Sequence, residues 1–196
     1  MTIPGTLLRL FALVAALLLA ACASGPSLST ADTQDVEGLT RAIRALGPDV
    51  DPEEAARAAR IAYSHTQVLA REYQITDSPL VHNTKVNMGL KPRGLCWHWA
   101  EDMEARLAEE NFRTLSLHRA VANADNPFRL EHSTAIISAR GGGYRDGIVL
   151  DPWRLGGVLH WALTREDTKY DWQPRAKVMA MKRERKTERS QLTALR

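Results

Sequence analysis

Cysteine is scarce in this sequence, with Cys22 and Cys96 as the only two among 196 residues. Two cysteines are too few to hold a small domain together by disulfides, so a disulfide scaffold is excluded. Long apolar runs are also scarce and 25% of the residues are charged, which excludes a membrane protein with several spans. No internal repeat is present. The length fits one ordinary domain with its own hydrophobic core.

The longest apolar run lies at residues 10–21, and Arg9 is the only charged residue up to its end. Its length suits the core of an export signal and is short for a spanning helix. The run ends in Leu19-Ala20-Ala21-Cys22, which resembles the bacterial lipoprotein box. The resemblance implies a signal peptide over residues 1–21 and a lipoprotein whose acyl chains, palmitate among them, are attached to Cys22. Ordinary secretion with cleavage at the same point, or a membrane anchor, are the alternatives.

Ala23 and Ser24 follow this cysteine, and no aspartate stands there. By resemblance to the lipoprotein sorting rules of Gram-negative cells, this favours the cell envelope at the periplasmic face of the outer membrane. Residues 22–34 are mostly small and polar and suit a tether. Because lipid occupies the thiol of Cys22, Cys96 has no disulfide partner in an oxidising compartment, and a free thiol there needs an explanation.

Helices are predicted over residues 35–46 and from Asp51 to about Tyr73. The first has apolar residues at helical spacing, and the second begins with Asp51 as a cap and Pro52 in the first turn. Residues 74–94 are expected to be irregular, because prolines, asparagines and glycines interrupt them, and a loop of this length is often functional. A further helix with one apolar face is predicted from Leu95 or Cys96.

The apolar period then changes to that of strands. Strands are predicted over residues 114–122, 132–139, 147–151 and 158–163, and Gly141-Gly142-Gly143 separates the second from the third. Helices followed by a run of strands predict an α+β domain over residues 35–174, with N-terminal helices and an antiparallel β-sheet.

The composition shifts again at Arg175. Residues 175–196 contain eight basic and two acidic residues, a formal charge of +6, whereas the rest of the chain after the signal peptide carries −4. This basic C-terminal tail is expected to be a solvated, partly helical or disordered end. Adhesion to anionic lipid or to an acidic envelope polymer is the functional alternative. Nucleic acid is not an expected partner of an exported protein.

Cys96 stands at the start of a predicted helix, directly after the breaker Gly94. The unpaired amides and the dipole at a helix N-terminus favour a thiolate, which is the reactive form of cysteine. Lys91 and Arg93 lie just upstream and add positive potential. The alternative for Cys96 is a small buried hydrophobic residue, the usual fate of a free cysteine.

A nearby imidazole would take the proton of this thiol. His98 points away from Cys96, because residues two apart on a helix differ by about 200°. His132 opens a strand, and the next strand ends in Asp151. A tight turn at Gly141-Gly142 would place His132 directly opposite Asp151, which then holds one imidazole nitrogen while the other faces Cys96. If all of residues 141–147 are loop, the pair drifts apart. The other histidines stay open, two as surface residues and two on strands: His65, His82, His118 and His160.

The order of these pieces is similar to that in the transglutaminase-like branch of the papain-like cysteine protease fold. The matching segments are Gly94-Leu95-Cys96-Trp97, Glu131-His132 with its strand, and residues 148–153, which contain Asp151-Pro152. The resemblance implies Cys96 as nucleophile, His132 as general base and acid, and Asp151 as the group that orients His132. It also implies a papain-like core and an acyl-thioester formed from an amide. Thr134 departs from the family, which commonly has an aromatic residue there.

An enzyme of this kind also needs donors for the oxyanion, and the backbone amide of Cys96 is the natural first. Asn83 and Asn87 are the side-chain candidates, with solvated loop positions as the alternative. Trp97 and Trp153 are the best candidates for a substrate-binding wall, although such tryptophans more often belong to the core. The histidines and Cys96 lack the close spacing of zinc ligands, so neither a metal nor another cofactor is expected.

These features together predict a membrane-anchored thiol hydrolase or acyltransferase. Its expected substrate is an amide or isopeptide bond in an envelope protein or a cell-wall peptide. Hydrolysis is favoured slightly over transamidation, because water needs no second binding site. A binding module that has lost turnover and a purely structural lipoprotein are the alternatives.

Overall fold

The computed structural model describes residues 30–194, and the compact unit begins at Asp35. The signal peptide predicted over residues 1–21 and the lipidation of Cys22 lie outside the described residues, as does most of the predicted tether. The helices are α2 (Thr30–Arg44), α3 (Pro52–Glu72), α4 (Pro79–Asn87), α5 (Cys96–Ala108) and α6 (Arg175–Ala194). Within the described part, no helix is both long and apolar enough to cross a membrane.

The caps and breakers in the sequence set the starts of α3 and α5 as predicted. Asp51 caps α3, and its Oδ1 accepts hydrogen bonds from the amides of Glu53 at 2.8 Å and Glu54 at 3.0 Å. α5 begins at Cys96 and buries its apolar face. Because α5 starts there, the thiol lies at the end of the helix and not along its side.

The expectation of an irregular segment over residues 74–94 is wrong in its middle, where α4 forms. Ser78 precedes the helix and Pro79 occupies its first turn, which is a favourable start. Only His82 among the nine residues of α4 is buried. The helix therefore has no apolar stripe, and periodicity alone does not reveal it.

The strands form one antiparallel sheet in the order β4-β3-β2-β1-β5. They are β1 (Leu115–Ala122), β2 (His132–Ala139), β3 (Ile148–Asp151), β4 (His160–Leu163) and β5 (Gln173–Pro174), with a 3₁₀ turn η1 (Tyr144–Asp146) before β3. The first four strands agree with the prediction. β5 was not expected, because two residues are too few to show alternation. The α+β class with an antiparallel sheet is confirmed.

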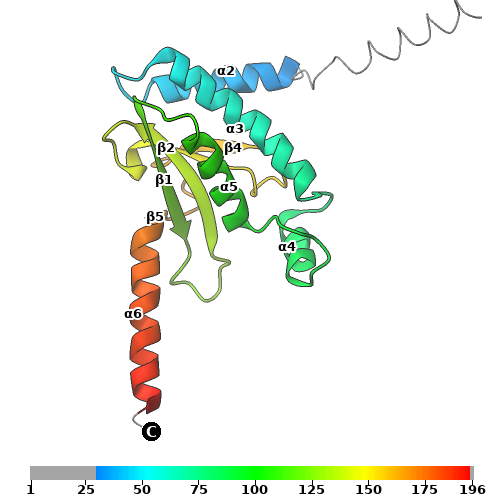
Figure 1. The fold of residues 1–196 in the computed structure, drawn as a ribbon, viewed down its shortest axis with the longest axis vertical. Helices are drawn as coiled ribbons and strands as arrows, with labels where there is room; N and C mark the ends of the chain where they lie inside the picture. The colour runs from blue at the N-terminus through cyan, green and yellow to red at the C-terminus, as the bar shows by residue number, and fades with distance from the viewer. Residues whose placement is uncertain (1–29, 195–196) are drawn as a thin grey trace, which may run out of the picture. The chain divides into compact units, whose positions relative to one another are not determined.

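Both faces of the sheet are covered near its centre, and β2 is buried over all but its last residue. α5 packs on β2 and β1, and α3 packs against α5 (Figure 1). Arg119 of β1 marks this face, because it pairs with Glu104 of α5 at 3.5 Å. On the opposite face Trp172 packs with Ile136 of β2 and Val149 of β3.

The register between β2 and β3 differs from the predicted one by two residues. Ala135 pairs with Leu150 and Ile137 with Ile148, so Asp151 lies at the level of Thr134 and not directly opposite His132. The cause is the connection, which contains η1 as well as the glycine turn. A shift of two keeps every side chain on its face, so His132 and Asp151 remain diagonal neighbours on one face.

The basic tail forms α6, which contacts β1 and β5. Val178 is the buried residue of the helix. Two ion pairs connect α6 to the segment before β2: Lys182 binds Glu131, and Arg185 binds Asp125 at 2.7 Å. The tail is thus helical and held at its first turns, while most of its later side chains are exposed.

Candidate active site

The start of α5, and with it Cys96, is fixed by side chains of the helix itself. His98 Nδ1 accepts hydrogen bonds from the amides of Gly94 at 3.1 Å and Leu95 at 3.2 Å. Trp99 Nε1 donates to the carbonyl of Gly94 at 3.0 Å. His98 therefore satisfies amides that the helix leaves unpaired, and it is not the base for the thiol.

Gly94 is required by the turn that leads into Cys96. Its φ is +123°, and a Cβ placed there would lie 2.4 Å from His82 Nε2. His82 is buried, contrary to the surface position that the sequence suggested, and its Nε2 bonds the carbonyl of Arg93 at 2.8 Å. The tight approach of this ring leaves no room for a side chain before the helix.

The thiol of Cys96 is protonated at rest, contrary to the expected thiolate. Cys96 is 8% exposed, and burial raises the pKa of its thiol to about 11, although the backbone amides of Ser133 and Trp97 oppose the shift. The positive charge expected from Arg93 is balanced, because Arg93 binds Asp102 at 2.9 Å. Lys91 donates to the carbonyl of Gln74 at 3.0 Å.

His132 and Asp151 form the hydrogen bond that the sequence predicted. His132 Nε2 donates to Asp151 Oδ2 at 2.7 Å, and both side chains are 1% exposed. Burial alone would raise the pKa of Asp151, but the contacts from His132 and Arg154 outweigh it and lower that pKa. Because a carboxylate can only accept, Nε2 carries a proton, and in the tautomer that this bond selects Nδ1 is an acceptor. Nδ1 is buried and has no hydrogen-bond partner within the described residues.

Arg154 is the member of this site that sequence reasoning missed. Its Nε donates to Asp151 Oδ2 at 2.9 Å, and its other nitrogens bind Asp167 at 3.0 and 2.6 Å. Asp167 also accepts from Trp172 Nε1 at 2.9 Å. The only signal in the sequence was an arginine three residues after Asp151. Asp151 and Asp167 share the one guanidinium of Arg154, so these three residues carry a net charge of −1. A proton on His132 would balance that charge.

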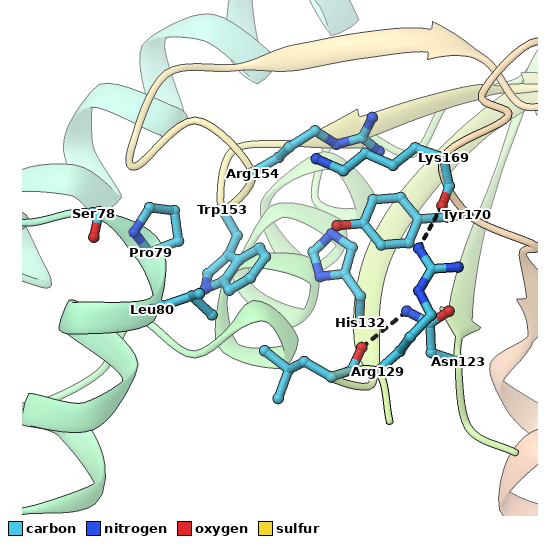
Figure 2. A pocket seen from close by; sticks show the side chains of 11 residues that line it. Ser78, Pro79, Leu80, Asn123, Arg129, His132, Trp153, Arg154, Lys169 and Tyr170 are labelled. Atoms are coloured by element: carbon cyan, nitrogen blue, oxygen red, sulfur yellow. Dashed lines mark hydrogen bonds between the residues drawn. The ribbon is translucent and has the colours of Figure 1, made fainter. Parts of the chain in front are cut away.

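Three aromatic rings surround the imidazole of His132. The ring centres of Trp153 and Tyr170 lie 4.7 Å from it, and that of Trp172 lies 5.4 Å from it. Figure 2 shows His132 between Trp153 and Tyr170. The predicted substrate-binding residue Trp153 thus packs on the base, and its ring belongs to the same buried cluster as Cys96.

Cys96 lies beside the backbone of His132 and not in a hydrogen bond with its ring. The thiol donates to the carbonyl of Glu131 at 3.6 Å and contacts the amide of Ser133. In an extended strand these two groups point to the same edge, on either side of the residue between them. The thiol therefore sits at the edge of β2 next to His132, while the imidazole lies on the face that carries Trp172.

Separate pockets open beside the two groups. One, of about 440 Å³, is lined by His132 and is called the His132 pocket here; the other, of about 410 Å³, is lined by Cys96 and is called the Cys96 pocket. Leu130 lines both. The two pockets therefore meet at the residue that precedes the Glu131-His132 pair.

The remaining predicted site residues line the Cys96 pocket. Trp97 is 44% exposed and forms part of its wall. Asn83 Oδ1 accepts from Trp153 Nε1 at 3.0 Å. An indole nitrogen is only a donor, so this contact fixes the amide of Asn83 and leaves its NH₂ group for another acceptor. Asn87 is exposed at the end of α4 and lines the same pocket.

The other histidines serve structural contacts. Arg154 Nη1 donates to His160 Nε2 at 2.9 Å, and burial followed by the charge of Arg154 lowers the pKa of His160. His118 hydrogen-bonds Ser138 Oγ at 2.8 Å, near the opposite end of β2 from His132. In the part of the chain that the structure describes, no group of His, Cys, Asp and Glu side chains is arranged to hold a metal ion.

Comparisons with known proteins found no relative of this chain. No protein-family model, no curated protein and no solved structure matches the chain.

Proposed function

We propose that this protein is a thiol enzyme that cleaves or transfers the acyl group of an amide, with Cys96 as nucleophile, His132 as base and Asp151 as its orienting group. The observation that supports the proposal is the buried, unpartnered Nδ1 of His132, whose Nε2 is bound to Asp151 and whose backbone neighbours Glu131 and Ser133 contact the thiol. A buried acceptor without a donor costs free energy, and a role in proton transfer is one reason for a fold to keep it. We propose a papain-like arrangement of the core on the same grounds.

The first step follows from the protonated thiol. The thiol leaves the carbonyl of Glu131 by rotation about its Cα–Cβ bond, and His132 Nδ1 takes its proton as sulfur attacks the carbonyl carbon. Positive charge then develops on His132, and the excess negative charge of Asp151, Asp167 and Arg154 together stabilises it. The oxyanion lies near the amide at the start of α5, with the NH₂ group of Asn83 as the second donor.

The second half returns the proton. His132 gives it to the departing nitrogen, the C–N bond breaks, and an acyl-thioester remains on Cys96. Attack by water gives hydrolysis, and attack by an amine gives transamidation. We favour hydrolysis, because water needs no pocket of its own.

The cell envelope is the proposed location, with lipid on Cys22 as the anchor and an envelope protein or cell-wall peptide as substrate. The proposal rests on the residues around Cys22, which resemble a lipoprotein box. Labelling cells with an alkyne analogue of palmitate tests it. Label on the wild type that disappears in Cys22→Ser supports the anchor, and equal label on both contradicts it.

A binding module without turnover is the second candidate, and one observation favours it. The described hydrogen bonds of the thiol go to backbone and not to His132, so the resting arrangement is not that of an ion pair. In that case the aromatic cage and the two pockets bind a ligand, and replacing Cys96 leaves the cellular role intact.

A generic acyl donor distinguishes the two. The full chain is mixed with p-nitrophenyl acetate, p-nitrophenolate release is followed by absorbance, and acetylation of Cys96 is located by mass spectrometry. The enzyme forms an acetyl-thioester on Cys96 that hydroxylamine removes. His132→Gln lowers the acetylation rate about 10²- to 10⁴-fold, the usual contribution of a general base.

Two further variants guard against misfolding as the cause. Asp151→Asn keeps the shape of the side chain but can present N–H to Nε2, which reverses the tautomer of His132, and we expect a loss of up to about 10⁴-fold. His118→Gln is the control outside the site and leaves the rate unchanged. Acetylation of Cys96 at the same rate in His132→Gln as in the wild type would contradict the enzyme.

A further inference from the structure

The His132 pocket has an unusual balance of charge. Arg129, Arg154 and Lys169 line it, and no carboxylate does. Arg154 is already neutralised, because it binds Asp151 and Asp167. Among the described residues neither Arg129 nor Lys169 forms an ion pair, so both cations are open to an anionic ligand, while the excess negative charge of Asp151, Asp167 and Arg154 lies behind His132.

Both charges lie around one ring. The guanidinium carbon of Arg129 is 6.0 Å from the ring centre of Tyr170, and Lys169 Nζ is 5.8 Å from it. Arg129 also donates to the carbonyl of Lys169 at 3.0 Å, which ties the two residues together without neutralising either. Figure 2 shows both side chains around Tyr170, next to His132. The cations thus form one wall of the pocket beside the base.

Across His132 from the two cations, Pro79 and Leu80 give the pocket an apolar side (Figure 2), and Leu80 is 63% exposed. Leu130, which is 52% exposed, adds to the apolar lining. A volume of about 440 Å³ lies in the range of sites that hold small ligands or short peptide segments. Apolar surface on one side and two cations on the other suit a short chain that carries a carboxylate.

The chemistry decides which part of a substrate this pocket receives. His132 must hand its proton to the departing nitrogen, so that nitrogen lies within hydrogen-bond reach of the imidazole. The residue attached to the nitrogen then extends into the pocket that His132 lines. The Cys96 pocket is left for the acyl side of the amide.

We propose that Arg129 and Lys169 recognise a carboxylate on the leaving-group side of the substrate, so that the enzyme acts on peptides with a negative charge just after the cleaved amide. The inference rests on the proposed function and names its substrate class. The carboxylate belongs either to the C-terminus of a short peptide or to an acidic side chain. In the reaction the C–N bond breaks and the C–S bond forms. The thiol proton passes through His132 to the released amine, which departs with its carboxylate.

Direct binding is the first test, because it does not require turnover. Isothermal titration compares the dipeptide Ala-Leu with its C-terminal amide on the full chain, and Ala-Glu amide supplies a carboxylate on the side chain only. The acid binds roughly 10- to 100-fold more tightly than the amide, the range expected for hydrogen bonds to charged groups. Tight binding of Ala-Leu alone identifies a terminal carboxylate, and tight binding of Ala-Glu amide identifies an acidic side chain.

A matched pair of double variants assigns the effect. Arg129→Gln with Lys169→Gln removes the preference for the acid. Arg60→Gln with Lys186→Gln removes the same charge from exposed positions that line neither pocket, and it keeps the preference. The inference would be overturned if neither Ala-Leu nor Ala-Glu amide bound the wild type more tightly than Ala-Leu amide, and also if a preference survived the loss of Arg129 and Lys169.

Partitioning of the acetyl-enzyme separates this inference from the function on which it rests. Acetyl-Cys96 made with p-nitrophenyl acetate is offered each dipeptide as the attacking amine, which occupies the leaving-group position. Transfer to the acid exceeds transfer to the amide by a similar factor. An acetyl-enzyme without this preference contradicts the subsite alone. A carboxylate preference in binding without any acetyl-enzyme contradicts the enzyme alone.

Discussion

The proposed base His132 and the proposed nucleophile Cys96 both lie near the start of β2, but their surroundings differ. His132 is held by buried charged groups, with Asp151 bound to it and Arg154 and Asp167 behind. The described hydrogen bonds of the Cys96 thiol involve only backbone groups, and its pocket is walled by the exposed Trp97 and by the first turns of α6. The charged side of the site, His132 with Asp151, Arg154 and Asp167, is held in place by ionic contacts. The thiol side, Cys96 and its pocket, is held in place by the start of α5.

This difference indicates how the site divides its tasks. The charged side sets the tautomer of His132 before any substrate arrives and provides for its positive charge. The Cys96 thiol keeps its proton until that proton can move to His132. On the proposed mechanism, Cys96 becomes nucleophilic only with a bound substrate, which would protect the thiol from oxidation at the proposed envelope location.

The largest loss of stability is expected when one residue of the buried charged group is removed. Arg154→Met removes the guanidinium but keeps the side-chain volume, and it leaves Asp151 and Asp167 buried without a cation. We expect a loss of about 3–5 kcal/mol in the free energy of unfolding, measured by urea denaturation, because breaking a buried pair costs this much. A loss below about 1 kcal/mol would show that the carboxylates do not depend on Arg154.

The raised pKa of the Cys96 thiol can be measured from the pH dependence of its alkylation. Alkylation of folded Cys96 by iodoacetamide is expected to rise with pH toward a midpoint of about 11, against 9.0 for an ordinary thiol. The chain unfolded in urea supplies the reference. A midpoint near or below neutral pH would instead establish the thiolate that the helix N-terminus alone predicts.

The same shift has a consequence for stability, and its sign is definite. The folded state keeps its thiol proton up to a higher pH than the unfolded state does. The contribution of this thiol is complete below pH 9 and is lost as pH rises toward about 11. Cys96→Ala should remove this part of the alkaline loss.

The positions of the three predicted catalytic residues could be read from the sequence because each stands at the end of an element. Gly94 marks the start of α5, and the strand patterns place His132 first in β2 and Asp151 last in β3. The register was wrong, yet an error of two residues preserves the face, so the predicted hydrogen bond still forms. A strand pattern predicts the face of each side chain even when the register is wrong by two residues. His132 and Asp151 can bond from diagonal positions, so the exact pairing did not have to be known.

What escaped prediction depends on packing between distant segments. Asp167 reaches Arg154 only because the chain after β4 returns over the sheet, and no local pattern shows this. The pKa of the thiol depends on burial among side chains that include Trp99 and Trp153, and burial outweighs the opposing backbone amides of Ser133 and Trp97. α4 lacks an apolar stripe, so only its capping residues indicated it.

The start of α5 provides a narrower test of the thiol side. Gly94→Ala must accept a positive φ and displace His82, and we expect it to lose about 1–3 kcal/mol in the free energy of unfolding and to slow acetylation of Cys96. Gly89→Ala is the matched control, because Gly89 also has a positive φ, +74°, but nothing within 4 Å of the added carbon. Equal losses in the two variants would show that backbone strain matters and the approach of His82 does not.

The smallest effect is expected where the thiol side meets α6. Lys182 binds Glu131, the residue before His132, but both side chains are well exposed to solvent. Lys182→Gln should therefore change the free energy of unfolding by less than about 1 kcal/mol, and the change should shrink further in high salt, because exposed pairs are screened. The loss in Arg154→Met should persist in the same salt, because its partners are buried. If high salt abolished the loss in free energy of unfolding equally in Lys182→Gln and Arg154→Met, both contacts would be exposed to solvent. The distinction between a buried charged side and an exposed contact with α6 would then be wrong.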